Sequence, residues 1–243
     1  MSDGILQAKK GETPKERLKH FAEENKERFD RFKYLVPNKR ILDFGCGSGG
    51  FALQVNGIAE EVVGVEPSGQ CRSFLNESGV RTYKNLIQLR EAEKEKFDIV
   101  FAFHVFEHLQ DPTAKLRELV ELTKQDGWIF IEVPNFMGDV FTQVYEQTGR
   151  DLGYLEFNVN DPHLFYFGKR SLTYMANKVN VDIDFVEYIQ RYSFSNHMFW
   201  LATGLPSGHK EWFFLDSKDI NDAYSSKLKE LGMTDAIMVA LRP

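Results

Sequence analysis

Short apolar runs alternate with amphipathic stretches over most of this chain. The apolar runs have the length of strands, and the stretches between them space apolar side chains three to four positions apart, as helices do. Strands are predicted at 40–44, 61–66, 80–84, 97–103 and 128–133, and helices at 13–37, 50–55, 68–76, 86–96 and 111–127. Strands that alternate with helices form a parallel sheet with crossover helices. The pattern therefore predicts an α/β fold with a doubly wound, mostly parallel sheet.

The last third of the chain is less regular. It predicts helices at 171–180 and 217–231 and strands at 181–188 and 236–241. Two strands at the end of an alternating pattern indicate an antiparallel strand at a sheet edge near the C-terminus. Turn residues and aromatics at 134–168 predict an insertion beside a ligand site. We expect a flexible N-terminus over residues 1–12 and a single domain over 13–243.

Composition narrows the class of protein. The 243 residues are 42% hydrophobic and 27% charged, which is typical of a globular chain. No apolar run reaches about 18 residues and no apolar leader opens the chain, so neither a transmembrane helix nor a signal peptide is expected. Two cysteines cannot form a disulfide framework, and a net charge of −6 disfavours a broad nucleic-acid surface. We expect a cytoplasmic protein without membrane or nucleic-acid partners; these features leave its oligomeric state open.

A glycine-rich turn joins the first predicted strand to the next helix. Glycines let a ligand approach the backbone closely, and the helix N-terminus offers it unpaired N–H groups. Gly45, Gly47 and Gly50 satisfy the pattern G-x-G-x-x-G, so a nicotinamide enzyme is one interpretation. Glu66, at the end of the second strand, suits the ribose hydroxyls of either kind of cofactor. Asp43 distinguishes the two kinds of cofactor, because its carboxylate would repel a pyrophosphate and attract the ammonium of a methionine moiety.

The pattern Asp-x-Gly-x-Gly-x-Gly, followed by Glu66-Pro67-Ser68 and the later strands, resembles class I S-adenosylmethionine-dependent methyltransferases over residues 38–135. The resemblance implies their Rossmann-like fold and S-adenosyl-L-methionine as the cofactor. It implies cofactor contacts by Asp43, Gly45, Cys46, Gly47, Gly49, Glu66, Pro67, Asn85, Phe103 and His104. Asn85 stands where the family often has an acid or amide near the adenine ring, and Cys46 is interpreted as a small residue of the loop.

The segment after the fourth predicted strand, FHVFEHL at 103–109, is rich in titratable side chains. It resembles the region of small-molecule methyltransferases that borders both the methyl donor and the acceptor. His108 is therefore a candidate catalytic base, since a neutral imidazole can take the proton of an acceptor hydroxyl. His163, after the fifth strand, is the second candidate. The alternative is that Glu107 and His108 only shape the loop through local hydrogen bonds.

The same segment also allows metal binding. His104 and His108 fit the H-x-x-E-H pattern of inverzincin proteases, but that pattern requires a helix and a strand precedes it here. Some RNA-end methyltransferases of this fold use Glu-x-x-Glu-His with a distant histidine. Here His104 replaces the first glutamate, and His163 could be the distant partner of Glu107 and His108. This substitution and the acidic net charge favour a metal-free site, and a metal-assisted RNA-end methyltransferase is the alternative.

The last third of the chain bears on the acceptor. Residues 161–172 resemble the tail of bacterial methyltransferases that include sugar- and polysaccharide-cluster enzymes, which places the 134–168 insertion on the acceptor side. Residues 191–212 are dense in aromatic and hydrogen-bonding side chains, which suits a sugar or nucleotide but also a packed subdomain. The sequence predicts a methyltransferase for a small-molecule acceptor, such as a sugar or nucleotide-sugar hydroxyl. The alternative from another class is a non-catalytic S-adenosylmethionine-binding regulatory module.

Overall fold

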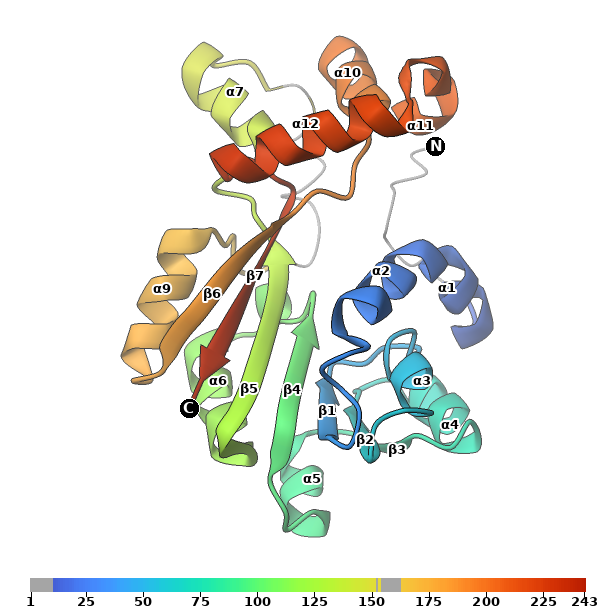
Figure 1. The fold of residues 1–243 in the computed structure, drawn as a ribbon, viewed down its shortest axis with the longest axis vertical. Helices are drawn as coiled ribbons and strands as arrows, with labels where there is room; N and C mark the ends of the chain where they lie inside the picture. The colour runs from blue at the N-terminus through green and yellow to red at the C-terminus, as the bar shows by residue number, and fades with distance from the viewer. Residues whose placement is uncertain (1–10, 152, 154–162) are drawn as a thin grey trace.

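Seven strands form one sheet in the computed structural model, which describes residues 11–151, 153 and 163–243 (Figure 1). The strands are β1 (Arg40–Phe44), β2 (Glu61–Val65), β3 (Arg81–Tyr83), β4 (Phe97–Phe103), β5 (Thr123–Pro134), β6 (Asp182–Ile189) and β7 (Ala236–Arg242). Their order is β3-β2-β1-β4-β5-β7-β6. The first five strands are parallel, and β7 runs antiparallel to β5 and β6. The predicted fold class is confirmed, including the antiparallel strand near the C-terminus.

The helices cover both faces of the sheet. They are α1 (Pro14–His20), α2 (Ala22–Phe32), α3 (Ala52–Val55), α4 (Gly69–Glu77), α5 (Leu86–Ala92), α6 (Pro112–Leu122), α7 (Val140–Thr148), α9 (Lys169–Lys178), α10 (Phe194–Thr203), α11 (Gly208–Glu211) and α12 (Lys218–Leu231), with single 3-10 turns η1 (Phe106–His108) and η2 (Phe213–Leu215). Apolar side chains of α5, α6 and α9 form one core with the sheet. Those of α2, α3 and α4 form the core on the other face. This two-sided cover is why the central strands are nearly all apolar.

A group of phenylalanines fills the core beneath α2 and α3. The ring of Phe101 on β4 lies 4.7 Å from that of Phe32 and 4.8 Å from that of Phe51, between ring centroids, and both pairs meet edge to face. Phe130 on β5 stacks on Phe101 at 5.3 Å. Such pairs stabilise a core beyond the area they bury. Some of the 21 phenylalanines of the chain therefore serve packing.

The N-terminal helix begins as predicted but is not continuous. The backbone N–H of Glu16 donates to Thr13 Oγ1, and the Glu16 carboxylate accepts from the Thr13 N–H at 2.8 Å, so the capping box is present. The predicted helix 13–37 divides at Phe21, whose φ of −99° and ψ of 20° are not helical. The second part ends at Phe32, before the predicted end.

The boundary between α6 and β5 also differs from the prediction. A helix closed by Gly127 was expected, but α6 ends at Leu122 and β5 begins at Thr123. Thr123 already pairs with Phe97 across the sheet, and a register shift follows on β4. Residues after Leu122 thus hydrogen-bond to a neighbouring strand instead of forming a last helical turn. The spacing of apolar residues along the chain does not predict such a long-range effect.

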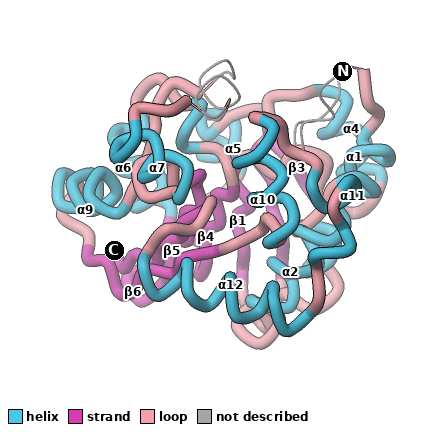
Figure 2. Tube along the Cα trace, turned by 90° about the horizontal axis from the view of Figure 1, so that it is seen from above, coloured by secondary structure: helices cyan, strands magenta, loops and turns pink. Residues whose placement is uncertain are grey.

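A group of helices lies beyond the carboxyl ends of β4 and β5. Figure 1 shows α7, α10, α11 and α12 together at this end, and Figure 2 shows the group from above. Trp200 of α10 is fully buried, with its ring centroid 5.0 Å from that of Phe141 of α7. The aromatic segment therefore contributes to packing here. The expected insertion contributes α7, while its residues 152 and 154–162, like residues 1–10 of the expected flexible N-terminus, lie outside the described residues.

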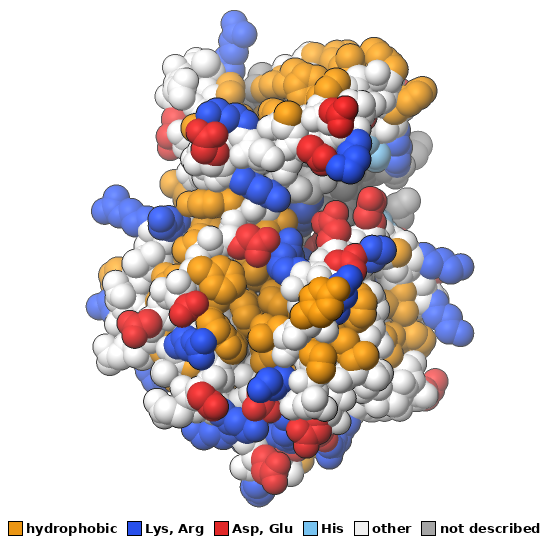
Figure 3. Space-filling view, in the orientation of Figure 1, with side chains coloured by type: hydrophobic (Ala, Val, Ile, Leu, Met, Phe, Trp, Pro, Cys, Tyr) orange, Lys and Arg blue, Asp and Glu red, His pale blue; other side chains and the backbone are white. Residues whose placement is uncertain are grey.

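Hydrophobic side chains also gather on the outer surface of this helical group (Figure 3). Leu205, Phe213 and Phe214 are each more than half exposed. None of the helices in the described part of the chain combines the length and apolar composition needed to cross a membrane.

Candidate functional site

The glycine loop lies at the carboxyl end of β1, in the middle of the sheet. Gly45, Gly47 and Gly49 have φ values of 78°, 54° and 79°, which residues with a side chain rarely adopt. The N–H groups of Gly45 and Cys46 donate to the carbonyl of Val65 at 2.7 and 3.2 Å, so the end of β2 holds the loop. A Cβ placed on Gly47 would meet no atom of the described residues within 4 Å. The loop is therefore open to a ligand at Gly47.

Glu66 lies beside this loop, as predicted. Its Oε2 accepts a hydrogen bond from the N–H of Gly47 at 3.0 Å, and its Oε1 accepts one from the N–H of Ser68 at 2.7 Å. A carboxylate offers about four lone-pair sites, so acceptor capacity remains for the hydroxyls of a ligand. Pro67 is exposed next to it. The side chain of Asn85 caps α5, so its contact with adenine stays a prediction.

Asp43 is buried at the end of β1, with 3% of its surface exposed. Burial raises the pKa of Asp43 to about 7; the charge of Arg28 acts against this rise, and that of Glu66 adds to it. A buried carboxylate is costly unless a cation pairs with it. Asp43 therefore suits a ligand that brings a positive charge into the site.

Cys46 points its side chain into the protein. A Cβ on Gly64 would lie 2.7 Å from the Cys46 Sγ, so the thiol packs closely against β2. Burial raises the pKa of the Cys46 thiol well above its usual value, and the charges of Asp43 and Glu66 add to this. A protonated, buried thiol is a weak nucleophile. Only the backbone of Cys46 is thus available to a ligand, in agreement with its interpretation as a small loop residue.

A buried ionic network, which the sequence analysis did not predict, lies behind the loop. Arg28 of α2 donates to Glu132 Oε1 at 2.7 Å, and its guanidinium lies 4.7 Å from the ring centroid of Phe103. Burial alone would raise the pKa of Glu132, but Arg28 and His104 hold it well below its usual value. The signal in the sequence was Glu132 itself, the only charged residue in the apolar run 128–133.

His104 belongs to this network. Its backbone φ is +52°, and its Nδ1 and Nε2 lie 3.2 Å from carboxylate oxygens of Glu107 and Glu132, with Arg191 Nη1 3.1 Å from Nε2. Burial and then Arg191 act to lower the pKa of His104, but the hydrogen bonds to the two glutamates outweigh them and raise it. His104 thus connects the buried network to η1, and its contact with a cofactor stays a prediction.

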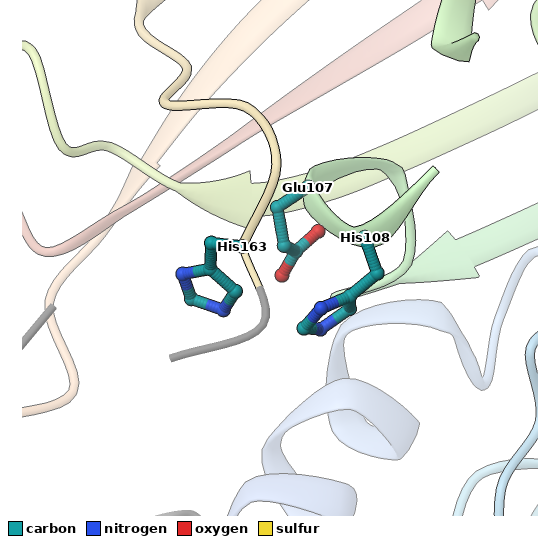
Figure 4. A group of neighbouring side chains, drawn as sticks. All are labelled: Glu107, His108 and His163. Atoms are coloured by element: carbon teal, nitrogen blue, oxygen red, sulfur yellow. The ribbon is translucent and has the colours of Figure 1, made fainter. Parts of the chain in front are cut away.

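A second group of titratable side chains lies at η1. It consists of Glu107, His108 and His163. Figure 4 shows the Glu107 carboxylate between the two imidazoles, and one ligand atom of each residue lies within 4.8 Å of the others. The two histidine rings are 4.8 Å apart between centroids. The carbonyl of Glu107 accepts from the N–H groups of Leu164 and Phe165 at 2.7 and 3.1 Å, which fixes the segment of His163 against η1. The structure thus brings both predicted catalytic histidines together.

The glycine loop is in contact with the segment that carries Glu107 and His108. A Cβ on Gly45 would lie 2.3 Å from Cγ2 of Val105, so the segment after β4 packs directly on the glycine loop. Both segments follow central strands at the carboxyl edge of the sheet, where the chain reverses its strand order between β1 and β4. Ligands of open α/β sheets bind at such a switch point. The glycine loop and the Glu107–His108–His163 group therefore border one site.

Sequence comparison identifies relatives of this chain. Residues 15–184, more than half of the chain, match the family described as "Methyltransferase domain". The ubiquinone biosynthesis O-methyltransferase of Thiobacillus denitrificans is 31% identical over 107 residues, which cover 41% of this chain and 46% of the relative. That of Hahella chejuensis is 32% identical over 107 residues, covering 41% and 45%. The chain thus spans less than half the length of these curated relatives.

Solved structures share the fold. A SAM-dependent methyltransferase from Archaeoglobus fulgidus has a TM-score of 0.58 at 19% identity, covering 94% of this chain and 97% of that one. The magnesium protoporphyrin IX methyltransferase of Synechocystis, solved with bound SAH, has a TM-score of 0.57 at 9% identity, covering 98% and 90%. At these identities the likeness supports the fold alone.

Proposed function

Since the chain belongs to the methyltransferase domain family, we propose that it transfers a methyl group from S-adenosyl-L-methionine to a small-molecule acceptor. One arrangement carries the proposal: buried Asp43, the open backbone at Gly47 and Glu66 all lie at the carboxyl ends of β1 and β2. The sites of a nicotinamide enzyme and of a methyltransferase share the glycine loop and the second acid. The buried carboxylate of Asp43 favours a methyltransferase, because this carboxylate requires a cationic partner.

Each of these residues has a role toward the cofactor. The cofactor supplies an electrophilic methyl group on a sulfonium. The carboxylate of Asp43 would pair with the ammonium of the methionine part, and the positive φ of Gly47 keeps the backbone free of a side chain where the ligand lies. Glu66, held by the N–H groups of Gly47 and Ser68, would accept hydrogen bonds from the ribose hydroxyls. Most of the rate would come from holding donor and acceptor in line.

We propose a hydroxyl oxygen as the methylated atom. The two relatives are O-methyltransferases, and two imidazoles lie beside the Glu107 carboxylate near the glycine loop, where they could take the proton of an acceptor hydroxyl. The assignment of His108 and His163 to this step is part of the proposal. A sugar or nucleotide-sugar hydroxyl is the proposed acceptor class, and a panel of sugar and phenolic hydroxyls tests it by methyl incorporation.

S-adenosylhomocysteine should stabilise this protein against heat. A ligand that binds only the folded state and is present at about 100 times its dissociation constant adds about 2.7 kcal/mol to the free energy of unfolding. We expect a corresponding rise in the melting temperature with S-adenosylhomocysteine and none with NAD⁺, measured by calorimetry at matched concentrations. Stabilisation by NAD⁺ alone would replace the proposal with a nicotinamide enzyme. Binding without turnover on any acceptor would favour the regulatory module.

Cofactor affinity should fall as the pH drops through about 7. The pKa of Asp43 is raised to about 7 without a ligand, and an ammonium beside it lowers that pKa in the complex, so only the ionised acid binds well. We expect affinity to be greatest between about pH 7 and 8 and to weaken by up to about tenfold per unit below that. Titration of S-adenosylhomocysteine by calorimetry measures this.

The control for this pH dependence is Asp43→Asn. The amide has the size of the acid but carries no charge in this range, so the variant should bind weakly with a nearly flat pH profile. A wild-type affinity that stays constant from about pH 5.5 to 8 would contradict the role of Asp43.

A further inference from the structure

We propose that Glu107, His108 and His163 bind one divalent transition-metal cation beside the glycine loop. One carboxylate oxygen and two imidazole nitrogens lie within 4.8 Å of one another, so a modest adjustment of side chains would bring all three to a common ion. Two imidazoles with a carboxylate are a ligand set that suits Zn²⁺ and its neighbours in the first transition row, whereas Mg²⁺ and Ca²⁺ prefer oxygen.

The Glu107 carboxylate shows the need for a further partner. Glu107 is 1% exposed, and its buried Oε2 has no hydrogen-bond partner among the described residues. A buried carboxylate oxygen without a partner is costly, and a cation at this position would satisfy it. Figure 4 shows the carboxylate directed between the rings of His108 and His163. The orphaned oxygen and the two imidazoles thus point to one occupant.

The surroundings hold these three residues in place. The other oxygen of Glu107 lies 3.2 Å from His104 Nδ1, and His104 is in turn held by Glu132. Such outer contacts orient the ligands of metal sites. The backbone of Glu107 is bonded to the segment that carries His163. The arrangement is therefore fixed by contacts on both sides.

A second group of possible ligands does not share these features. Glu24, His104 and Glu132 also lie within 4.8 Å of one another. Arg28 already donates to Glu132 at 2.7 Å and also pairs with Glu24. The negative charge of this second group is therefore compensated by a guanidinium, and it does not require a metal.

The role of the cation rests on the proposed methyl transfer. An open coordination position would take the acceptor oxygen and lower the pKa of its hydroxyl. The hydroxyl proton then leaves to solvent, and the oxygen forms the new O–CH₃ bond while the S–CH₃ bond of the sulfonium breaks. The two histidines serve as ligands in this case, so chelation distinguishes it from direct base catalysis by an imidazole.

Titration of Zn²⁺ into chelator-treated, tag-free protein tests the site. We expect one Zn²⁺ per chain by calorimetry, with affinity lowered at least about tenfold in His108→Ala, His163→Ala and Glu107→Gln. His209→Ala, on α11 away from this group, should bind like the wild type, and Mg²⁺ should bind far more weakly. The proposal would be overturned if Zn²⁺ did not saturate the protein at one equivalent. It would also be overturned if the Zn²⁺ affinity were unchanged in both His108→Ala and His163→Ala.

The titration is made without S-adenosylmethionine, so its outcome is separate from the proposed function. Zn²⁺ binding with no stabilisation by S-adenosylhomocysteine would leave the metal site and remove methyl transfer. Stabilisation by S-adenosylhomocysteine without Zn²⁺ binding would leave methyl transfer and remove the metal site. Circular dichroism and melting temperature of each variant confirm that it is folded.

Discussion

Replacing Gly47 by valine should weaken the binding of S-adenosylhomocysteine by more than about 100-fold, or about 2.7 kcal/mol. A Cβ at this position meets no atom within 4 Å in the part of the chain that the structure describes, so the branched side chain would occupy the space proposed for the cofactor rather than disrupt the core. The φ of +54° adds a backbone strain of about 1–2 kcal/mol. The fold should therefore persist while the site is blocked, and calorimetry with S-adenosylhomocysteine measures the loss.

Gly79→Val is the matched control for this experiment. Gly79 has a φ of +87°, and among the described residues a Cβ there would meet only Asn56 Nδ2, at 3.8 Å, so the substitution carries similar strain at a position after α4. We expect it to lower the melting temperature as Gly47→Val does and to leave cofactor affinity intact. Undiminished affinity in Gly47→Val would contradict the placement of the cofactor against this loop.

Replacing His108 or His163 by alanine should lower turnover by roughly 10²–10⁴-fold. Both imidazoles lie within reach of the Glu107 carboxylate on the proposed acceptor side, whereas the proposed cofactor contacts follow β1 and β2. The affinity for S-adenosylhomocysteine should therefore stay nearly unchanged while kcat falls. Methyl incorporation into the acceptor identified by the panel measures the first quantity, and calorimetry measures the second.

Chelation separates the two explanations of such a loss. If a cation is bound, removing it should abolish the activity of the wild type, and added Zn²⁺ should restore it. If an imidazole acts directly as the base, chelated enzyme should keep its activity. Full turnover in both alanine variants would leave positioning alone as the source of the rate and remove both assignments. His209→Ala should bind Zn²⁺ and S-adenosylhomocysteine like the wild type.

The local patterns in this sequence determine the fold class and the position of the glycine loop and its two acids. Apolar runs of strand length followed by amphipathic stretches favour a parallel sheet, because strands buried on both faces are mostly apolar. The glycines and the two acids are close in sequence to strand ends, so their positions at one sheet edge follow once the strands are placed. Gly47 and Glu66 accordingly meet through a hydrogen bond of 3.0 Å.

The boundaries of the helices and strands and the buried ionic network depend on contacts between residues that are distant in sequence. Thr123 joins the sheet because β4 offers it hydrogen bonds, which overrides a helical pattern that continued toward Gly127. Arg28 reaches Glu132 across 104 positions of sequence. An isolated acid in an apolar run signals that a buried partner exists, but it does not say which of the 30 lysines and arginines supplies it.

The sequence by itself determined that Glu107 and His108 follow the fourth strand and that His163 lies in the less regular part of the chain. Only the tertiary structure decided that ligand atoms of these three side chains lie within 4.8 Å of one another and that one Glu107 oxygen is buried with no hydrogen-bond partner among the described residues. Burial likewise decided that the pKa of Asp43 rises to about 7. The physical reason is the same in each case. Spacing along a chain fixes neighbours within one strand or helix, whereas burial and charge pairing depend on which distant segments pack against them.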